Sequence, residues 1–221
     1  MSFTRWPDPK ARAALLAAML LLAACSRSGN TTPTQESRPA GNFDSVELRG
    51  SAQLDVLTGP AGSVVVSGGA DDVANLESRV ENGTLVLQQR RGGVWMLQRE
   101  SVKVRVTLPA LKSLRVNGAS RASLSGPTGG EMSLLVNGAS SLEANGNVDR
   151  LTARLNGAGN MDLSQLTAVD ATVESNGAGS ITVNATGSLD ARVNGVGTIR
   201  YRGGPTQVRT TINGVGSIAA E

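Results

Sequence analysis

The chain has 221 residues, a formal net charge of +3, no histidine and one cysteine. Aromatic residues make up 2% of it. That is too few for the stacking platforms of single-stranded nucleic-acid binders, and the charge is too small for a nucleic-acid-binding footprint. One cysteine and no histidine leave no readable transition-metal site and no disulfide within the chain, so we expect no metal and no cofactor.

Residues 1–24 are typical of a signal peptide. Three basic residues precede the apolar run 13–22, which is too short to span a membrane as a mature helix. The stretch Leu22-Ala23-Ala24-Cys25 resembles the lipobox of bacterial lipoproteins. This resemblance implies cleavage before Cys25 and acylation of that residue. The alternative is that Cys25 is an ordinary residue of an uncleaved anchor or of a secreted protein.

Acylated Cys25 would anchor the protein stably in the membrane, because several acyl chains together bind a membrane firmly, whereas a single acyl chain binds it only marginally. The residue after Cys25 is Ser26 and not Asp, which resembles the outer-membrane lipoproteins of Gram-negative bacteria. The protein could face either the periplasm or the outside of the cell. The following residues to 42 are rich in Ser, Thr, Pro, Asn, Gln and Gly and carry almost no apolar side chains. We therefore expect a flexible tether over 25–42 and one elongated domain over 43–221.

Residues 43–110 alternate apolar and polar side chains over several short runs, which is the strand period. The run 102–108 is an amphipathic strand that Pro109 ends. Asn82-Gly83, between two such runs, predicts a hairpin with a type I′ turn. We interpret 43–110 as a strand layer that begins the solenoid and caps its first coil, because the end of a solenoid is an open sheet edge.

The stretch 90–99 breaks the strand pattern. Gly92-Gly93 predicts a turn, and four apolar residues follow it, among them Trp95. Two interpretations stay open. Trp95 and Leu97 could plug an open end of the repeat region, or Trp95 could contact a partner or a lipid headgroup.

The C-terminal half repeats one phrase, Asn-Gly-Ala/Val-Ser/Gly, six times, at spacings of 20, 19, 20, 18 and 19 residues. A fixed period near 20 is typical of a solenoid. Apolar residues alternate with period two on both sides of each phrase, so each repeat is expected to be a strand, a corner, a second strand and a connection. The corners are Asn117-Gly118, Asn137-Gly138, Asn156-Gly157, Asn176-Gly177, Asn194-Gly195 and Asn213-Gly214.

Two architectures fit these repeats. In an antiparallel meander each Asn-Gly would be a type I′ hairpin turn, whereas in a parallel β-helix each repeat would be one coil. We favour the β-helix, because a meander would not need the same corner at the same interval. The prediction is an all-β, single-stranded parallel β-helix of about six coils over 111–221, right-handed as parallel crossovers usually are. Its Asn side chains would stack ~4.8 Å apart and hydrogen-bond amide to amide.

Several segments together resemble the putative auto-transporter adhesin head domain family, also called the GIN domain, a domain of unknown function. The resemblance covers about 43–218, and it implies a β-helical fold and a cell-envelope location. The family more often carries serine where this chain has asparagine before the repeated glycine. The matching segments are Phe43-Asp44-Ser45-Val46, Asn82-Gly83-Thr84-Leu85, residues 104–111, Tyr201-Arg202-Gly203-Gly204-Pro205 and Gly214-Val215-Gly216-Ser217-Ile218.

Other chemistries fit the repeats less well. A phosphate-binding glycine loop opens a helix, and none is readable here. A calcium-binding solenoid carries a regular Asp, but the position six residues after each corner Asn is acidic only in Glu143 and Asp162. These two should point outward on adjacent coils, as in polysaccharide-cleaving enzymes, yet no aromatic platform accompanies them. Arg154, Glu174 and Arg192 should form an alternating column that supports the register.

The sequence therefore predicts a cell-envelope lipoprotein that is not an enzyme and presents a β-helical surface for adhesion or ligand binding. The expected partners are the membrane, through Cys25, and an envelope protein or a surface glycan. Nucleic acid is not expected. A structural or accessory envelope lipoprotein is the alternative, and a polysaccharide-active enzyme is the third class.

Overall fold

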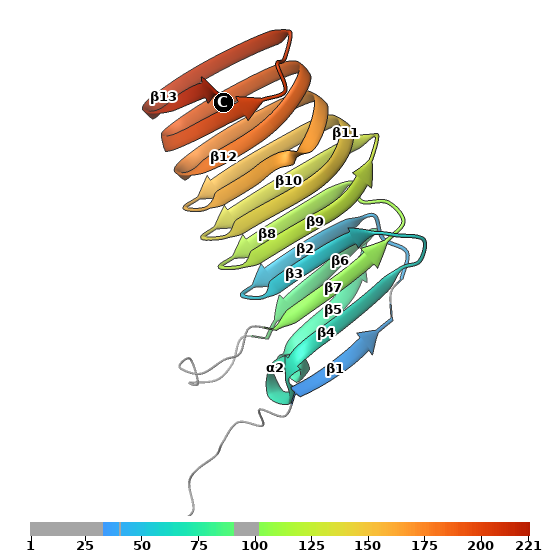
Figure 1. The fold of residues 1–221 in the computed structure, drawn as a ribbon. Coiled ribbons are helices and arrows are strands. Elements are labelled where there is room, and N and C mark those ends of the chain that lie inside the picture. Colours follow the sequence, from blue (N-terminus) through green and yellow to red (C-terminus); the bar gives the residue numbers. More distant parts are fainter. Residues whose placement is uncertain (1–32, 40, 91–101) are drawn as a thin grey trace, which may run out of the picture.

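The computed structural model describes residues 33–39, 41–90 and 102–221, and Figure 1 shows their arrangement. Almost all of them lie in strands, which confirms the predicted all-β class. Cys25 and Trp95 lie outside the described residues. The elements are β1 (Pro33–Arg38), β2 (Ser45–Gly50), β3 (Gln53–Thr58), β4 (Ser63–Gly69), α2 (Ala70–Asn75), β5 (Leu76–Glu81), β6 (Thr84–Gln89), β7 (Lys103–Leu108), β8 (Ser113–Gly118), β9 (Arg121–Thr128), β10 (Glu131–Gly138), β11 (Ser141–Gly157), β12 (Asn160–Arg202) and β13 (Gln207–Ala220).

Successive Asn-Gly repeats pair with one another as parallel strands. Asn137 lies opposite Asn117 in β8 and opposite Asn156 in β11, and Asn213 lies opposite Asn194. The strands that follow the corners pair in the same way, β9 with β11 and β11 with β12. Equivalent residues of neighbouring repeats are therefore adjacent in space, and the corners lie along one edge of the molecule (Figure 1).

The positions that the period-two pattern turns inward are buried. Leu114 and Val116, before the first corner, have no exposed surface, and Ala122 and Leu124, after it, are at most 1% exposed. Burying a Val, Leu or Ile side chain fully stabilises a fold by about 1.5–3 kcal/mol. The core is thus a stack of aliphatic layers, one for each repeat, and its contents follow from the alternation in the sequence.

A first corner without asparagine precedes the six predicted ones. β2 and β3 pair in parallel with β8 and β9, which places Arg49 opposite Asn117 and Gly50 opposite Gly118. On their other side β2 and β3 pair with β6 and β7, also in parallel. The expected strand layer over 43–110 thus includes parallel strands that stack directly on the first Asn-Gly repeat, before residue 111. Residues 45–58 form a parallel layer that lies between the layer of β6 and β7 and the first Asn-Gly repeat.

Strand direction reverses at the N-terminal end of the sheet. β4 pairs antiparallel with β7, β1 with β4, and β5 with β6, so the whole sheet has mixed orientation. The short helix α2 lies there too and buries Val73. The predicted hairpin between β5 and β6 is present, with positive φ at both turn residues, 48° at Asn82 and 75° at Gly83, as a type I′ turn requires.

The predicted flexible tether over 25–42 is wrong for part of its length, because 33–38 form β1. The composition is polar, but β4 offers an edge of unpaired backbone groups, and backbone pairing does not depend on apolar side chains. Arg38 adds side-chain contacts, with its Nη2 donating to the carbonyl of Val73 at 2.8 Å and its Nη1 to that of Leu76. The last turn of α2 is therefore held by β1.

The C-terminal end of the sheet is less covered. Among the described strands, β13 pairs with β12 alone. Its core-facing residues Val208 and Ile212 are 43% and 44% exposed, whereas their partners in β12, Leu189 and Val193, are 2% and 0% exposed. The last aliphatic layer of the core is therefore open to solvent on one side.

Candidate binding surface

Six asparagine side chains, one from each predicted corner, are joined amide to amide. From the second asparagine on, each Nδ2 donates to the Oδ1 of the preceding asparagine, over 2.6, 2.8, 2.9, 2.8 and 3.0 Å. Because the five bonds run in one direction, the amide dipoles reinforce one another. We call this row the asparagine ladder: Asn117, Asn137, Asn156, Asn176, Asn194 and Asn213.

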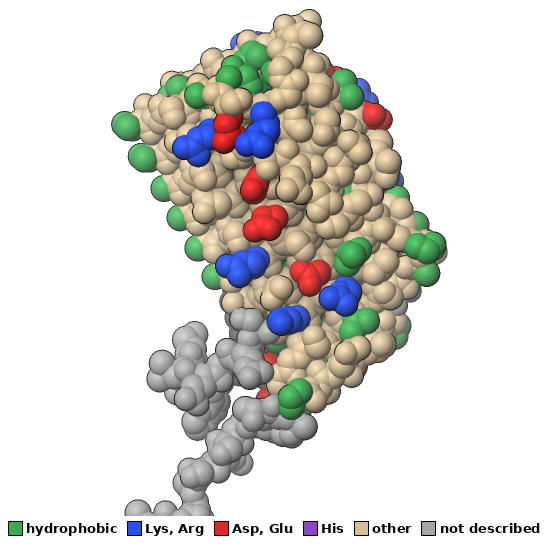
Figure 2. All heavy atoms as spheres, viewed as in Figure 1, with side chains coloured by type: hydrophobic (Ala, Val, Ile, Leu, Met, Phe, Trp, Pro, Cys, Tyr) green, Lys and Arg blue, Asp and Glu red, His purple; other side chains and the backbone are tan. Residues whose placement is uncertain are grey.

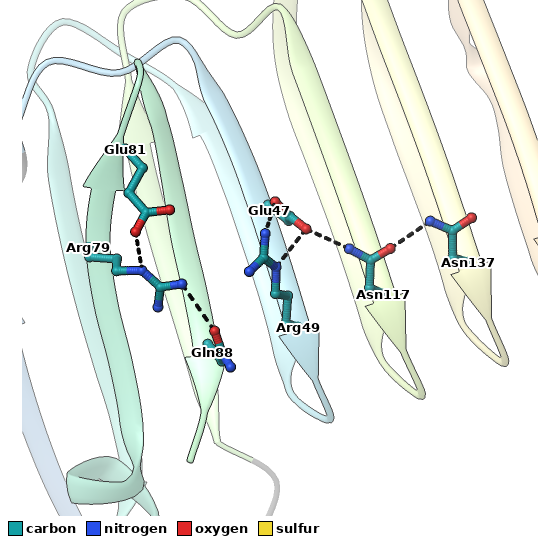
Figure 3. A network of polar contacts seen from close by, with 7 residues as sticks. All are labelled: Glu47, Arg49, Arg79, Glu81, Gln88, Asn117 and Asn137. Atoms are coloured by element: carbon teal, nitrogen blue, oxygen red, sulfur yellow. Dashed lines mark hydrogen bonds and ion pairs between the residues drawn. The ribbon is translucent and has the colours of Figure 1, made fainter. Parts of the chain in front are cut away.

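The asparagine ladder begins at a carboxylate. Asn117 donates to Oε1 of Glu47 at 2.8 Å, and Arg49 binds both oxygens of the same carboxylate, at 2.7 and 2.9 Å (Figure 3). The side chain of Glu47 is 12% exposed. The hydrogen bond from Arg49 holds the pKa of Glu47 below its ordinary value, against burial, which raises it. A fixed negative charge therefore faces the donor end of the amide row.

The corner glycines allow the repeats to approach closely. Gly138 has a φ of 109°, and a Cβ there would lie 2.5 Å from the carbonyl oxygen of Gly118. Gly157 has a φ of 139°, and its Cβ would lie 2.4 Å from the carbonyl oxygen of Gly138. Both the positive φ and the backbone contact exclude any larger residue without a shift of the chain. The close stacking of the repeats therefore requires glycine at this position of the phrase.

The fourth residue of the phrase also supports the stacking of the repeats, as a serine in the first two repeats and as a glycine in the others. Ser120 and Ser140 are buried, and their hydroxyls donate to the carbonyls of Gly50 and Gly118, both at 2.9 Å. From the third repeat on, glycine takes this position. The residue just before each corner asparagine faces the core. At this position Ser175 lies between a leucine of the preceding repeat and a valine of the next one, and its buried hydroxyl has no hydrogen-bond partner within the described part of the chain.

Glu143 and Asp162 lie opposite each other on neighbouring strands, as the repeat predicts. Both side chains are exposed. Asp162 accepts a hydrogen bond from the backbone of Ser164 at 3.0 Å, and its bonds to Ser164 hold its pKa below the ordinary value. Neither carboxylate lines either of the two hollows described below. The pair can attract a cation or a polar group from solvent, but the structure gives it no enclosed reaction site.

The predicted column of alternating charge is only half formed. Arg154 lies 3.3 Å from Glu174, as expected. Arg192 instead binds Asp190 on its own strand, at 2.6 Å. Glu174 accepts a hydrogen bond from Asn194 at 3.1 Å, so the asparagine ladder takes the place of the second predicted ion pair. Both ion pairs are at least partly exposed, and such pairs contribute at most about 1 kcal/mol.

Two open hollows lie over the strands that precede the corners. One, of about 600 Å³, is lined by Lys112, Glu131, Arg150 and neighbouring residues. The other, of about 400 Å³, crosses four repeats and includes Asp170, Asp190 and Arg209. Both contain charges of either sign, which suits a polar or zwitterionic partner better than an apolar one. Within the described ranges no three potential metal ligands cluster.

Apolar side chains also lie along the corner edge. Figure 2 shows them as a row on the left side of the molecule, while acidic and basic side chains mix on the face in view. The third residue of the phrase supplies this row. It is alanine in the first four repeats, and it becomes valine in the last two, where Val196 and Val215 are 62% and 74% exposed.

Sequence reasoning missed Glu47, Arg49 and Gly50, which begin the ladder and form the additional corner. The Asn-Gly pattern does not include this corner, because arginine takes the place of asparagine in Arg49-Gly50. The flanking signal is nevertheless there, since buried Leu48 precedes the corner and buried Leu54 follows it at the same spacing as in the other repeats. The apolar positions together with the glycine therefore indicate this corner even without the asparagine.

The family model described as "Putative auto-transporter adhesin, head GIN domain" matches residues 42–205. The chain belongs to this family. The resemblance on which the sequence prediction rested is thereby confirmed. The matched range of the GIN domain ends before β13. Among proteins of curated function, none matches this chain.

Several solved structures share the GIN-domain fold at low sequence identity. A putative adhesin from Bacteroides fragilis is 22% identical, with a TM-score of 0.69 over 87% of this chain and 99% of that one. A putative adhesin from Parabacteroides merdae is 15% identical, with a TM-score of 0.58 over 87% and 98%. A putative lipid binding protein from Parabacteroides distasonis is 22% identical, with a TM-score of 0.54 over 87% and 98%. At these identities the likeness shows the fold alone.

Proposed function

We propose that this GIN-domain protein is a non-catalytic lipoprotein of the cell envelope, anchored in the outer membrane through Cys25, which uses its stacked strands as a surface for adhesion. One observation carries the proposal: polar side chains repeat in register over the outer faces, and the hollows on those faces are open and of mixed charge. Such a surface fits an extended partner, an envelope protein or a surface glycan. The family description, an adhesin head domain, supports the same function.

We propose further that the repeat region coils as a single-stranded parallel β-helix. Three features support this: parallel pairing of each repeat with the next, identical register at every corner, and a core enclosed between the strands before and after the corners. A coil also gives a reason for the asparagine ladder, because only stacked corners bring the same side chain to the same place every turn. The antiparallel strands of the N-terminal end stand outside this coil.

The anchor would set the orientation of the molecule. β1 begins eight residues after Cys25, and eight residues reach at most about 29 Å. β1 lies at the end of the sheet remote from β13 (Figure 1). An acylated Cys25 would therefore keep the N-terminal end near the membrane and direct the C-terminal end away from it. Among the residues that the structure describes, no helix is long and apolar enough to cross a membrane.

The anchor can be tested by mass spectrometry of the membrane fraction. We expect a mature N-terminus at Cys25 with a thioether-linked diacylglycerol and an acylated amine. Cys25→Ser should release the protein into the soluble fraction, because the acyl chains hold it. The proposed anchoring through Cys25 would be excluded if the mature Cys25 carries no acyl chains, or if the Cys25→Ser protein stays in the membrane.

Binding can be tested with purified outer-membrane polysaccharide and, separately, with purified outer-membrane proteins. The double change Arg150→Ser and Arg209→Ser removes cations from the hollows and should weaken binding. The control, Arg105→Ser, removes an exposed cation outside them and should not. If the double change and the control weaken binding equally, the hollows are not the binding surface. Polysaccharide cleavage that Glu143→Gln and Asp162→Asn abolish would overturn the non-catalytic assignment.

A further inference from the structure

Among the described residues, the outer side of β13 combines an unpaired strand edge with uncovered core residues. Val208 and Ile212 face the core and are 43% and 44% exposed, and Val215 at the corner is 74% exposed. We call these three residues the terminal patch. In the preceding repeat the core-facing equivalents, Leu189 and Val193, are covered by β13 itself. The terminal patch and the free backbone edge together are what one further strand would cover.

The other edges of the sheet are protected against such pairing. β5 carries Glu77, Arg79 and Glu81 in six residues, and β1 carries Pro33, Glu36 and Arg38 in six. Charged residues and proline on short edge strands are the usual means by which proteins prevent edge-to-edge association. β13 has 14 residues and a single charged side chain, Arg209, which lies opposite Asp190 of the same chain. The edge of β13 therefore lacks this protection.

We propose that the occupant of this edge is the edge of a second copy, so that two molecules associate head to head through β13. In a two-fold contact each residue of one edge faces a fixed residue of the other, and Arg209 is the single charged residue that each β13 would bring to it, so little charge repulsion opposes the pairing of two such edges. The charged N-terminal edges cannot take part in the same way, so the contact closes as a two-fold dimer and does not propagate as a filament. A two-fold axis makes the two β13 strands antiparallel, which pairs their backbone groups and covers both terminal patches.

Sedimentation equilibrium of the full chain in density-matched detergent tests the dimer. We expect a reversible dimer for the wild type. Ile212→Lys should weaken association about tenfold or more, since it places an unpaired charge in the contact, and Ile212→Glu should do the same. An equimolar mixture of the two variants should associate more strongly than either variant alone, because the mixed contact then carries one charge of each sign in place of two like charges.

The control is Val80→Lys, which adds the same charge at a residue that is 37% exposed on β5, at the other end of the sheet. It should leave association unchanged. At a concentration low enough for the wild-type dimer to dissociate, thermal melting of each Ile212 variant should match the wild type, because this side chain is already 44% exposed in the single chain. A monomeric wild type, equal weakening by Val80→Lys, or a mixture of Lys and Glu variants that stays monomeric would overturn the proposal.

Discussion

The two ends of this molecule are built by opposite means. At the N-terminal end the strand direction reverses in β1, β4 and β5, the edge strands are six residues long, and α2 packs beside them. At the C-terminal end the parallel pairing of the repeats continues into β13 without change, and the structure shows no cap on it within the described residues. One end is closed by a separate set of elements, and the other is formed by a repeat like those before it.

The difference follows from what a repeat can and cannot do. Each repeat covers the core layer of the one before it, and it exposes an identical layer on its other side. Only elements of another kind, such as α2 with its buried Val73, can end this series. The two ends should therefore differ in how much their core residues contribute to stability, and the predictions below measure that difference.

The largest effect is expected from core truncation at the closed end. Leu76, at the start of β5, is 2% exposed, whereas Ile212 in β13 is 44% exposed. Leu76→Ala should lower the free energy of unfolding by about 2–5 kcal/mol, because it leaves a cavity. Ile212→Ala should cost clearly less, and chemical denaturation of the two variants gives both values. In protein diluted until the proposed dimer dissociates, equal losses would mean that the C-terminal end of the single chain is covered as well as its N-terminal end.

Arg38 should contribute more to the free energy of unfolding than other arginines at this closed end. Its side chain is 10% exposed and donates to the carbonyls of Val73 and Leu76. Arg38→Ala would leave these carbonyls without their donor, which should cost about 1–3 kcal/mol. Arg105→Ala, at an exposed position on β7, should change stability by no more than about 0.5 kcal/mol. If both variants melt alike, β1 does not hold α2 in the way described.

The asparagine ladder should lose more from a change in its middle than from one at its open end. Asn156 makes two amide bonds within the ladder and Asn213 makes one. A net hydrogen bond contributes about 0.5–1.5 kcal/mol. Asn156→Ala should therefore cost about twice as much as Asn213→Ala in a denaturation experiment. A larger loss at Asn213 would contradict the view that the ladder is anchored at Glu47 and ends freely.

Where the sequence predicted this molecule well, the signal was local and repeated. The Asn-Gly corners and the alternation around them predict the parallel register of Asn117 with Asn137, because each repeat states the same pattern. The hairpin at Asn82-Gly83 was predicted for the same reason, since its turn geometry depends on those two residues. A short pattern with one physical solution can be read without knowing its neighbours.

The elements that the sequence did not predict depend on partners distant in the chain. β2 and β3 lie between strands that follow them in sequence, so their order in space differs from their order along the chain. β1 forms on polar residues because β4 provides an edge. The six-residue helix α2 has a single buried residue, Val73, too little for a periodic signal. The apolar spacing around Arg49-Gly50 indicates a corner there, but no local pattern encodes the place of β2 and β3 in the sheet, the pairing of β1 or the helix α2.

The smallest predicted effect concerns the charge at which the asparagine ladder begins. The hydrogen bond from Arg49 holds the pKa of Glu47 below its ordinary value of 4.5 in the folded protein. A depressed folded-state pKa contributes stability above the ordinary value, and this contribution is lost as the pH falls through the folded-state pKa. The free energy of unfolding should therefore decrease on acidification below about pH 4.5, and less so in Glu47→Gln.

Asp44 provides the comparison for this measurement. Its pKa is also lowered, chiefly by a hydrogen bond from Lys112, whose side chain is 73% exposed. Solvent screens an exposed pair, so Asp44→Asn should flatten the acid limb of the stability profile less than Glu47→Gln does. If the two substitutions flatten it equally, Glu47 is no better shielded than a surface carboxylate. The carboxylate end of the asparagine ladder would then be as open to solvent as its end at Asn213.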